Sequence, residues 1–221
     1  MDKSGTVAAP TVISSLHPSP QGDAPLSDIP PANLAQPNVS LADPGLFADA
    51  ATADEFRAAF RNHPAGVAVI TADAGDGPVA LTATSVFSVS LTPPLLVFAI
   101  SELSSSAPTI RRAETVVVHL LGASQLDIAK LGATSGIDRF ADTSIWSRLP
   151  TGEPYFPAAH AWIRGRIINK MEAGGSTVVA VLALETKSPH ADGSAADAAE
   201  AQPLVYHNRT WHKLGESSKI L

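Results

Sequence analysis

The hydrophobic pattern of the chain changes its period several times, and each change predicts a different element. Residues 52–63 have helical spacing and begin with a capping box formed by Thr52 and Glu55. Pro64 should end this helix, because the residue before a proline disfavours helical dihedral angles. From Gly66 onward the apolar residues are β-branched and continuous, which predicts strands rather than helices.

Turn residues divide the β-branched stretches into separate strands. The cluster 73–78 is rich in Asp and Gly and predicts a hairpin, whose second strand runs over 79–89 until Pro93 and Pro94 break it. The pattern also predicts strands over 66–71, 95–100, 115–121, 162–168, 177–184, 204–207 and 210–214, and helices that begin after Ser104–Ser106 and at Ser124. About eight strands without βαβ alternation predict a mainly β fold, a closed or nearly closed barrel.

The first fifty residues differ from the rest in composition. They hold eight of the eighteen prolines, and they carry −4 of the net charge of −6. Such a stretch cannot bury enough apolar surface to offset the entropy of ordering it. We therefore expect a mostly disordered arm over 1–50, a folded domain over 51–215 and a short tail over 216–221. A further exposed loop is expected over 188–201.

Charge and cysteine content exclude several classes of function. The remaining charge of −2 gives no electrostatic argument for binding nucleic acid or an anionic membrane. The chain has no cysteine, which excludes disulfides, iron–sulfur clusters and thiolate zinc sites and fits a cytoplasmic protein. Its start lacks a charged segment followed by an apolar run, so no secretory signal is expected. The longest apolar stretch, 95–100, is too short to span a bilayer.

The motifs of common catalytic and nucleotide-binding sites are missing from the sequence. It has no G-x-G-x-x-G after a strand, no Walker loop, no H-E-x-x-H and no G-x-S-x-G. The seven histidines lack metal-ligand spacing, and His160, His207 and His212 are interpreted as surface or packing residues. No nucleophile–base pair stands out. We therefore assign no catalytic side chain and no metal site.

Residues 80–95 read A-L-T-A-T-S-V-F-S-V-S-L-T-P-P-L, which resembles the central motif of the flavin reductase-like family. Four further segments resemble that family in the same order along the chain, namely 60–72, 125–129, 138–140 and 204–214. Together the resemblance spans residues 52–214. It implies an FMN-binding split β-barrel of Greek-key-like topology that assembles as a homodimer, with FMN held where the two copies meet.

The chemistry of a flavin agrees with this resemblance. Small residues at Thr82–Ser85 let backbone groups approach the polar pyrimidine edge of the ring. Ser104–Ser106 precedes a predicted helix, whose free N–H groups and dipole favour a phosphate. The residues expected to bind the cofactor, FMN or else FAD, are Leu81, Thr82, Ala83, Thr84, Ser85, Ser88, Val89, Ser90, Ser101, Ser104, Ser105, Ser106, His119, Arg139 and Phe140.

Several of these residues have a second interpretation that the sequence leaves open. The Thr82–Ser85 run also fits an ordinary half-exposed strand, and Ser104–Ser106 fits a plain helix cap. Asp138–Phe140 fits a surface ion pair beside a packed phenylalanine, instead of a segment near the flavin. His119 stands where the family has asparagine, and it fits either a polar group near the ring or a core histidine with one hydrogen bond.

The sequence also departs from the family at positions linked to nicotinamide use. Gly174-Gly175-Ser176 replaces the Gly-Asp-His that many relatives have before the late strand, so the histidine beside the flavin or nicotinamide is missing. Ala80 replaces a glycine, and Thr92 replaces an aspartate. These changes leave the barrel and FMN binding in place but put the use of NADH or NADPH in doubt.

The leading hypothesis is an NAD(P)H:flavin oxidoreductase that supplies reduced flavin to a partner monooxygenase. Direct hydride transfer from a nicotinamide to the flavin needs position and electrostatics rather than a side-chain nucleophile. One alternative is an FMN- or deazaflavin-dependent oxidoreductase that does not use NAD(P)H. Another is a non-catalytic flavin-binding module whose proline-rich arm contacts another protein. The sequence does not distinguish NADH from NADPH.

Overall fold

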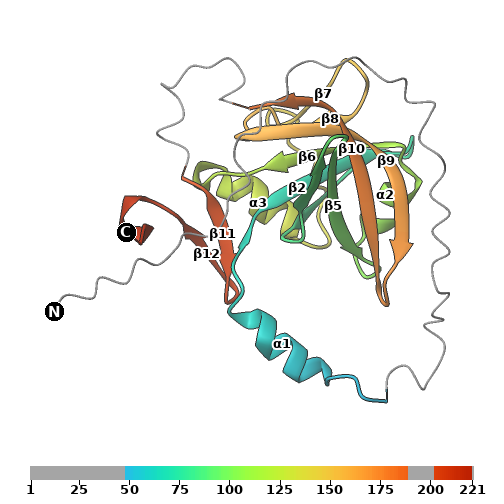
Figure 1. Ribbon diagram of the computed structural model, residues 1–221. Coiled ribbons are helices and arrows are strands. Elements are labelled where there is room, and N and C mark those ends of the chain that lie inside the picture. The colour runs from blue at the N-terminus through green and yellow to red at the C-terminus, as the bar shows by residue number, and fades with distance from the viewer. Residues whose placement is uncertain (1–47, 189–201, 221) are drawn as a thin grey trace, which may run out of the picture. The chain divides into compact units, whose positions relative to one another are not determined.

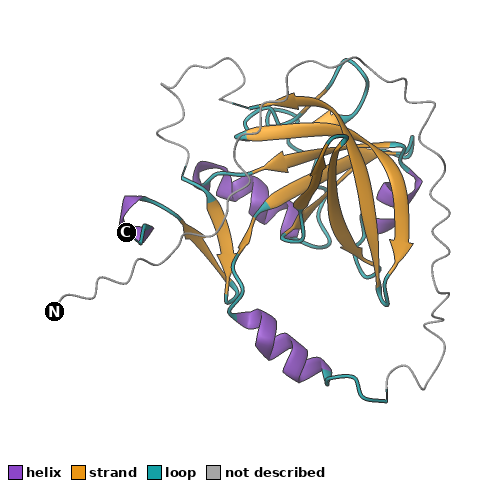
Figure 2. Cartoon of the chain, in the orientation of Figure 1, coloured by secondary structure: helices purple, strands orange, loops and turns teal. Residues whose placement is uncertain are grey.

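The computed structural model describes residues 48–188 and 202–220. The predicted arm over 1–50 and the predicted loop over 188–201 lie almost entirely outside these residues. Strands dominate the described chain, with a few short helices between them (Figure 2). In this part of the chain, no helix is both long and apolar enough to cross a membrane.

The centre of the fold is a seven-stranded antiparallel sheet in the order β3-β2-β6-β9-β10-β5-β4 (Figure 1). Its strands are β2 (Ala68–Asp73), β3 (Pro78–Ala83), β4 (Phe87–Leu91), β5 (Pro94–Ser101), β6 (Thr115–Leu120), β9 (Ala161–Glu172) and β10 (Ser176–Lys187). β3 and β4 follow one another in sequence but form opposite edges of the sheet. The sheet must therefore curl to bring its two edges together.

Shared packing of the two edges shows this curling. Leu81 of β3 and Phe98 of β5 belong to one buried core cluster, although four strands separate β3 from β5 in the sheet order. No backbone ladder joins β3 to β4 among the described residues. The predicted mainly β class and split-barrel architecture are confirmed, with a curled open sheet in place of a fully closed barrel.

Smaller elements surround this sheet. Two short sheets are formed by β1 (Ala65–Gly66), β11 (Leu204–His207) and β12 (Thr210–Lys213), and by β7 (Ser147–Arg148) and β8 (Pro154–Tyr155). The helices are α1 (Ala53–Arg61), α2 (Ala107–Arg112), η3 (Ala123–Gln125), α3 (Leu126–Ala133) and η4 (Glu216–Ser218). The two-residue strands β1, β7 and β8 were not predicted, because they are too short to show a period.

Local side-chain hydrogen bonds explain two predictions that are confirmed. The capping box of α1 is present: the Glu55 N–H donates to the Thr52 hydroxyl, and the Thr52 N–H donates to the Glu55 carboxylate at 2.9 Å. The β2–β3 hairpin closes at the predicted turn, where the Asp73 carboxylate accepts the amide N–H groups of Gly75 and Gly77.

Two predictions about element boundaries are wrong. The strand expected over 79–89 is two strands, because the chain leaves β2 after Ala83 and joins β5 from Phe87 onward. The Ser85 hydroxyl holds this crossing point, since it accepts the Ala99 N–H at 3.0 Å and lies 3.3 Å from the Ala99 carbonyl oxygen. Ser124 does not cap the following helix, because it lies inside the turn η3 that precedes α3.

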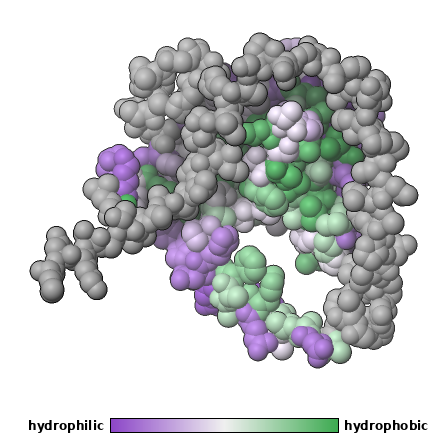
Figure 3. All heavy atoms as spheres, in the orientation of Figure 1, coloured by the Kyte–Doolittle hydropathy of each residue, from purple (hydrophilic) through white to green (hydrophobic). Residues whose placement is uncertain are grey.

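Helix α1 differs from the rest of the fold in its packing. It buries none of its residues. The rings of Phe56 and Phe60 contact each other at a tilt of 40°, with centroids 4.8 Å apart, and remain 61% and 58% exposed. Figure 3 shows apolar atoms on α1 and on the neighbouring face of the sheet. An exposed apolar surface of this kind marks a binding site or an interface.

Candidate functional site

A cavity of about 600 Å³ opens between β3, β5 and α3. Its volume lies in the range of small-molecule sites. Nine of the residues predicted to bind a cofactor line it: Leu81, Thr82, Ala83, Thr84, Ser85, Ser101, Ser104, Ser105 and Arg139. The fold therefore brings together the strand segment and the serine segment, which are separate in sequence.

Helix α3 forms one wall of this cavity, because it packs unusually close to β3. A β-carbon on Gly132 would lie 2.5 Å from the Thr82 hydroxyl oxygen and 3.1 Å from the Thr82 backbone nitrogen. The Thr82 hydroxyl in turn donates to the Ala129 carbonyl oxygen at 2.6 Å. Only glycine fits at position 132 without moving the helix.

The wall formed by α3 was not predicted as part of the site. Gly132, Ser135 and Gly136 line the cavity beside the predicted residues. The sequence pattern that points to this contact is the pair of small residues Ala129 and Gly132, one helical turn apart, because small side chains let a helix approach a strand closely.

Most of the predicted hydroxyl groups are already bonded within the fold. Thr82 donates to α3, Ser85 binds the backbone of β5, and the buried Ser106 hydroxyl donates to the Ala80 carbonyl oxygen at 2.8 Å. Ser106 therefore holds α2 against β3 rather than facing the cavity. Any flavin edge lying along β3 would be recognised by main-chain groups more than by these side chains.

The other end of the cavity combines hydroxyl groups with a cation. Arg139 donates to the Thr134 carbonyl oxygen at 2.7 Å, and its second terminal nitrogen lies 3.5 Å from the Ser105 hydroxyl. Its buried Nε has no hydrogen-bond partner in the part of the chain that the structure describes. The cavity lining includes Ser104 but no carboxylate. These groups suit a phosphate, because a guanidinium and hydroxyls all donate to its oxygens.

Six of the predicted residues do not line this cavity: Ser88, Val89, Ser90, Ser106, His119 and Phe140. The first three lie on β4 beyond the crossing point. Phe140 is buried against Trp146 and Phe156, with ring centroids 5.0 and 5.8 Å away. The Asp138–Arg139 ion pair that was considered is not formed, because the Asp138 carboxylate accepts the Phe140 N–H at 2.9 Å.

His119 corresponds to the core interpretation rather than to a group near a ligand. It is fully buried, its Nδ1 lies 2.9 Å from the Val69 carbonyl oxygen, and its Nε2 accepts the Phe156 N–H at 3.0 Å. Burial lowers its pKa to about 4, so the ring is neutral at pH 7. We do not retain His119 as a cofactor ligand, because both ring nitrogens are used by the backbone.

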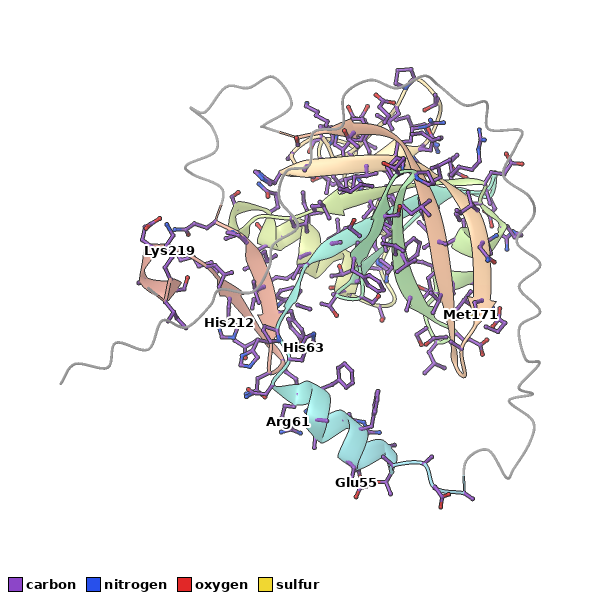
Figure 4. All side chains as sticks on the ribbon, in the orientation of Figure 1. Glu55, Arg61, His63, Met171, His212 and Lys219 are labelled. Atoms are coloured by element: carbon purple, nitrogen blue, oxygen red, sulfur yellow. The ribbon has the colours of Figure 1, made fainter. Side chains whose placement is uncertain are left out.

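A second cavity of about 720 Å³ lies beside the first and was not predicted. It is enclosed by α1, by the β3–β4 connection and by the β11–β12 hairpin, and it shares Thr84 and Ser85 with the first cavity. Figure 4 shows Arg61 and His63 at the end of α1 that meets this hairpin, near His212. The β3–β4 connection therefore contributes to the lining of both cavities.

Comparison with known proteins identifies the family of the chain. Residues 60–215 match the model of the flavin reductase like domain. The chain belongs to the flavin reductase-like family. A relative from Rhodococcus qingshengii, named NADH:FMN oxidoreductase, is 44% identical over 161 residues, which cover 73% of this chain and 81% of that protein. The family predicted from the sequence is thus confirmed.

Another relative and a solved structure are also similar to this flavin reductase-like chain. The reductase component of a 4-nitrophenol and 4-nitrocatechol monooxygenase from Rhodococcus opacus is 27% identical, over 69% of this chain and 76% of its own. The crystal structure of a flavin reductase domain protein from Arthrobacter sp. FB24 is 30% identical, with a TM-score of 0.66, and covers 73% of this chain and 95% of its own.

The segment that replaces Gly-Asp-His in this flavin reductase-like chain lies at one end of the β9–β10 hairpin. Gly174-Gly175-Ser176 forms the turn between β9 and β10, with Gly174 at a φ of +62°. The Gly175 carbonyl accepts the Glu102 N–H at 3.0 Å, and Ser176 pairs with Ser101, which lines the first cavity. The segment that corresponds to Gly-Asp-His in the family resemblance is therefore paired with a strand residue of the first cavity, although Ser176 itself is not among the residues that line it.

Proposed function

We propose that this flavin reductase-like protein is an NADH-dependent FMN reductase. The observation that carries the proposal is the first cavity, where main-chain groups of β3 face a wall formed by α3 and an anion-binding end holds Arg139 and two serines. The 44% identical NADH:FMN oxidoreductase supports the choice of NADH and FMN. If the ligand were FAD, its diphosphate would lie at the same end of the cavity, beside Arg139 and the two serines.

In this proposal the protein binds and orients two ligands and excludes water between them. Ser104, Ser105 and Arg139 hold the flavin phosphate, and the backbone of Leu81–Thr84 lies along the polar edge of the ring. The bound flavin supplies the chemistry, because it accepts a hydride directly from a nicotinamide. This explains why no acid–base pair of side chains is needed in the cavity.

The product of this reaction, reduced flavin, is proposed to serve a separate monooxygenase. The relative from Rhodococcus opacus is the reductase component of such a system. A mixture of the protein, NADH, FMN and a flavin-dependent monooxygenase should carry out hydroxylation. Reduced flavin that reaches the monooxygenase by diffusion requires no contact between the two proteins. Hydroxylation that persists when a dialysis membrane separates them would support supply by diffusion, whereas its loss would indicate direct transfer.

We also propose a homodimer whose second copy covers the mouth of the flavin site. Leu103 lines the first cavity and is 97% exposed, while Phe87 of the second cavity is 61% exposed. Val89 and Leu91 continue this apolar surface along β4, an edge strand of the sheet. Apolar side chains at the rim of a ligand site are suited to contact a second subunit that completes the pocket.

The absorption spectrum of the protein with FMN, before and after anaerobic addition of NADH, tests the function. Bound FMN should give a yellow protein, and NADH should bleach it. Absence of bleaching with both NADH and NADPH would remove the reductase function. Tight FMN binding without bleaching would favour the second candidate, a flavin enzyme that does not use nicotinamides, which the Gly174-Gly175-Ser176 turn suggests.

A further inference from the structure

Arg139 reaches the first cavity from a loop over residues 134–146, which connects α3 to β7. Few contacts hold its guanidinium directly. It donates to the Thr134 carbonyl oxygen at 2.7 Å, whereas the Ser105 hydroxyl is 3.5 Å away and the buried Nε has no partner within residues 48–188 and 202–220. An arginine side chain has many rotamers, so its position at a ligand site depends on how well the backbone below it is fixed.

The end of helix α3 fixes this backbone on one side of Arg139. Thr134 is the C-cap of the helix, and both its backbone N–H and its hydroxyl donate to the Lys130 carbonyl oxygen, at 3.0 and 2.8 Å. The carbonyl group that accepts the Arg139 guanidinium therefore belongs to a residue bonded to the last turn of α3.

Two side chains fix the backbone on the other side, and both bind Phe140. The Asp138 carboxylate accepts the Phe140 N–H at 2.9 Å, and the Trp146 indole N–H donates to the Phe140 carbonyl oxygen at 3.0 Å. The first of these bonds holds the peptide group that joins Arg139 to Phe140, and the second holds the next peptide group. Together they restrict the backbone directly beside the arginine.

Ring packing keeps Trp146 and Phe140 in place. Their ring centroids are 5.0 Å apart and their planes meet at 87°, an edge-to-face arrangement that aromatic pairs favour. Phe140 also stacks on the buried Phe156, with centroids 5.8 Å apart. The Arg148 guanidinium lies over the Trp146 ring, 5.9 Å from its centroid, and forms an ion pair with Asp73 at the end of β2. The indole that holds the loop is therefore itself held by the core and by β2.

We propose that Trp146 and Asp138 are positioning residues for the phosphate of the flavin. By holding the peptide groups of Phe140, they keep the Arg139 guanidinium beside Ser105 at the anion-binding end of the first cavity. Neither residue is among those that line this cavity, so both act on a ligand through Arg139. The inference rests on the proposed function, because it takes the phosphate of FMN as the group that Arg139 binds.

Trp146→Phe tests the proposal, because it keeps an aromatic ring against Phe140 but removes the indole N–H. FMN affinity should fall ~5-fold, the effect of one lost hydrogen bond. Riboflavin has no phosphate, and its affinity should be nearly unchanged. Equilibrium titration of flavin fluorescence measures both. Trp211→Phe is the control, because Trp211 packs against the same core cluster from β12 but lies outside the loop. It should leave the ratio of FMN to riboflavin affinity as in the wild type.

A pair of variants at the exposed Asp138 tests the same loop if Trp146→Phe lowers the stability of the fold. Asp138→Asn and Asp138→Ala both remove the charge, but only asparagine keeps an oxygen that can accept the Phe140 N–H. The alanine variant should therefore bind FMN ~5-fold more weakly than the asparagine variant. The two variants should bind riboflavin equally. Equal FMN affinities for the two variants would remove Asp138 from the positioning role.

A double-mutant cycle with Arg139→Gln separates positioning from packing. If Trp146 acts through Arg139, adding Trp146→Phe to Arg139→Gln should change FMN affinity by less than about twofold, because residues in one network are not additive. The same ~5-fold loss with and without Arg139 would show that Trp146 contributes packing alone. An equal loss of riboflavin and FMN affinity in Trp146→Phe would overturn the proposal as well.

These affinities are measured without NADH, so they separate the positioning role from the reductase function. If NADH does not bleach the bound FMN, the reductase function fails, while the ratio of FMN to riboflavin affinity still decides the role of Trp146 and Asp138. If the wild-type protein binds FMN no more tightly than riboflavin, no phosphate is held at Arg139 and the positioning role is overturned, whatever the result of the bleaching experiment.

Discussion

Gly132 of α3 touches Thr82 of β3 so closely that a β-carbon on the glycine would lie 2.5 Å from the threonine hydroxyl oxygen. The same hydroxyl donates to the Ala129 carbonyl oxygen one turn earlier in the helix. This contact fixes the distance between α3 and β3, and with it the width of the first cavity.

Gly132→Ala should increase the distance between α3 and β3. Alanine normally stabilises a helix, but here its methyl group forces α3 away from β3, which should lower the free energy of unfolding by about 1–3 kcal/mol. FMN affinity should fall as well. Urea unfolding and FMN titration measure the two effects. Gly175→Ala is the matched control, since a β-carbon there would meet no atom within 4 Å. A stable Gly132→Ala protein with normal FMN affinity would contradict this account.

Arg139→Gln should weaken binding of FMN much more than binding of riboflavin. The guanidinium lies beside Ser105 at the anion-binding end, so its loss removes a charge-assisted contact with the phosphate. We expect FMN affinity to fall ~10- to 100-fold, as the loss of one strong ionic hydrogen bond implies. Riboflavin has no phosphate, and its affinity should be nearly unchanged. An equal loss of affinity for FMN and for riboflavin would show that Arg139 does not act on the phosphate.

His119 should make the folded state sensitive to mild acid. Its pKa is about 4 in the folded protein, against an ordinary value of 6.5, because burial disfavours the charged ring. Between pH 4 and pH 6.5, His119 is therefore protonated in the unfolded chain and neutral in the folded protein. The contribution of neutral His119 to the free energy of unfolding is therefore complete above pH 6.5. It decreases as the pH falls from 6.5 toward 4, by about 3 kcal/mol in total.

His119→Asn provides the test, with urea unfolding at several pH values between 4 and 7. The variant should be less stable at pH 7, because the Phe156 N–H loses its acceptor. Its stability should then depend less on pH than that of the wild type. Parallel pH profiles for the two proteins would show that another group controls the acid sensitivity.

The apolar strand β4 should control the oligomeric state. A Val89→Glu, Leu91→Glu double variant places two charges on this exposed surface and should convert the proposed dimer to a monomer. Sedimentation equilibrium gives the mass directly. Ile220→Glu is the control, since Ile220 is 99% exposed but lies outside the strand. A double variant that keeps the mass of the wild type would remove β4 from the interface.

The sequence predicted those features that depend on local patterns. The capping box of α1 and the hairpin at Asp73 depend on side chains bonded to nearby backbone, and both are confirmed. The division of the 79–89 strand depends on a hydrogen bond between Ser85, in the β3–β4 connection, and Ala99 of β5, and this contact between segments distant in sequence leaves no local pattern. The same limit applies to the first cavity, because Gly132 of α3 and Thr82 of β3 are brought together only by the fold.

The hydroxyl groups of Thr82, Ser85 and Ser106 are committed to contacts within the fold: Thr82 binds α3, Ser85 binds β5, and Ser106 holds the start of α2 against β3. Recognition of a flavin along β3 is thereby left to amide and carbonyl groups, which every amino acid supplies. Substitutions in this segment should thus act first on the closure of the fold and only second on the ligand. A site of this construction tolerates divergence of its side chains, provided that the path of its main chain is preserved.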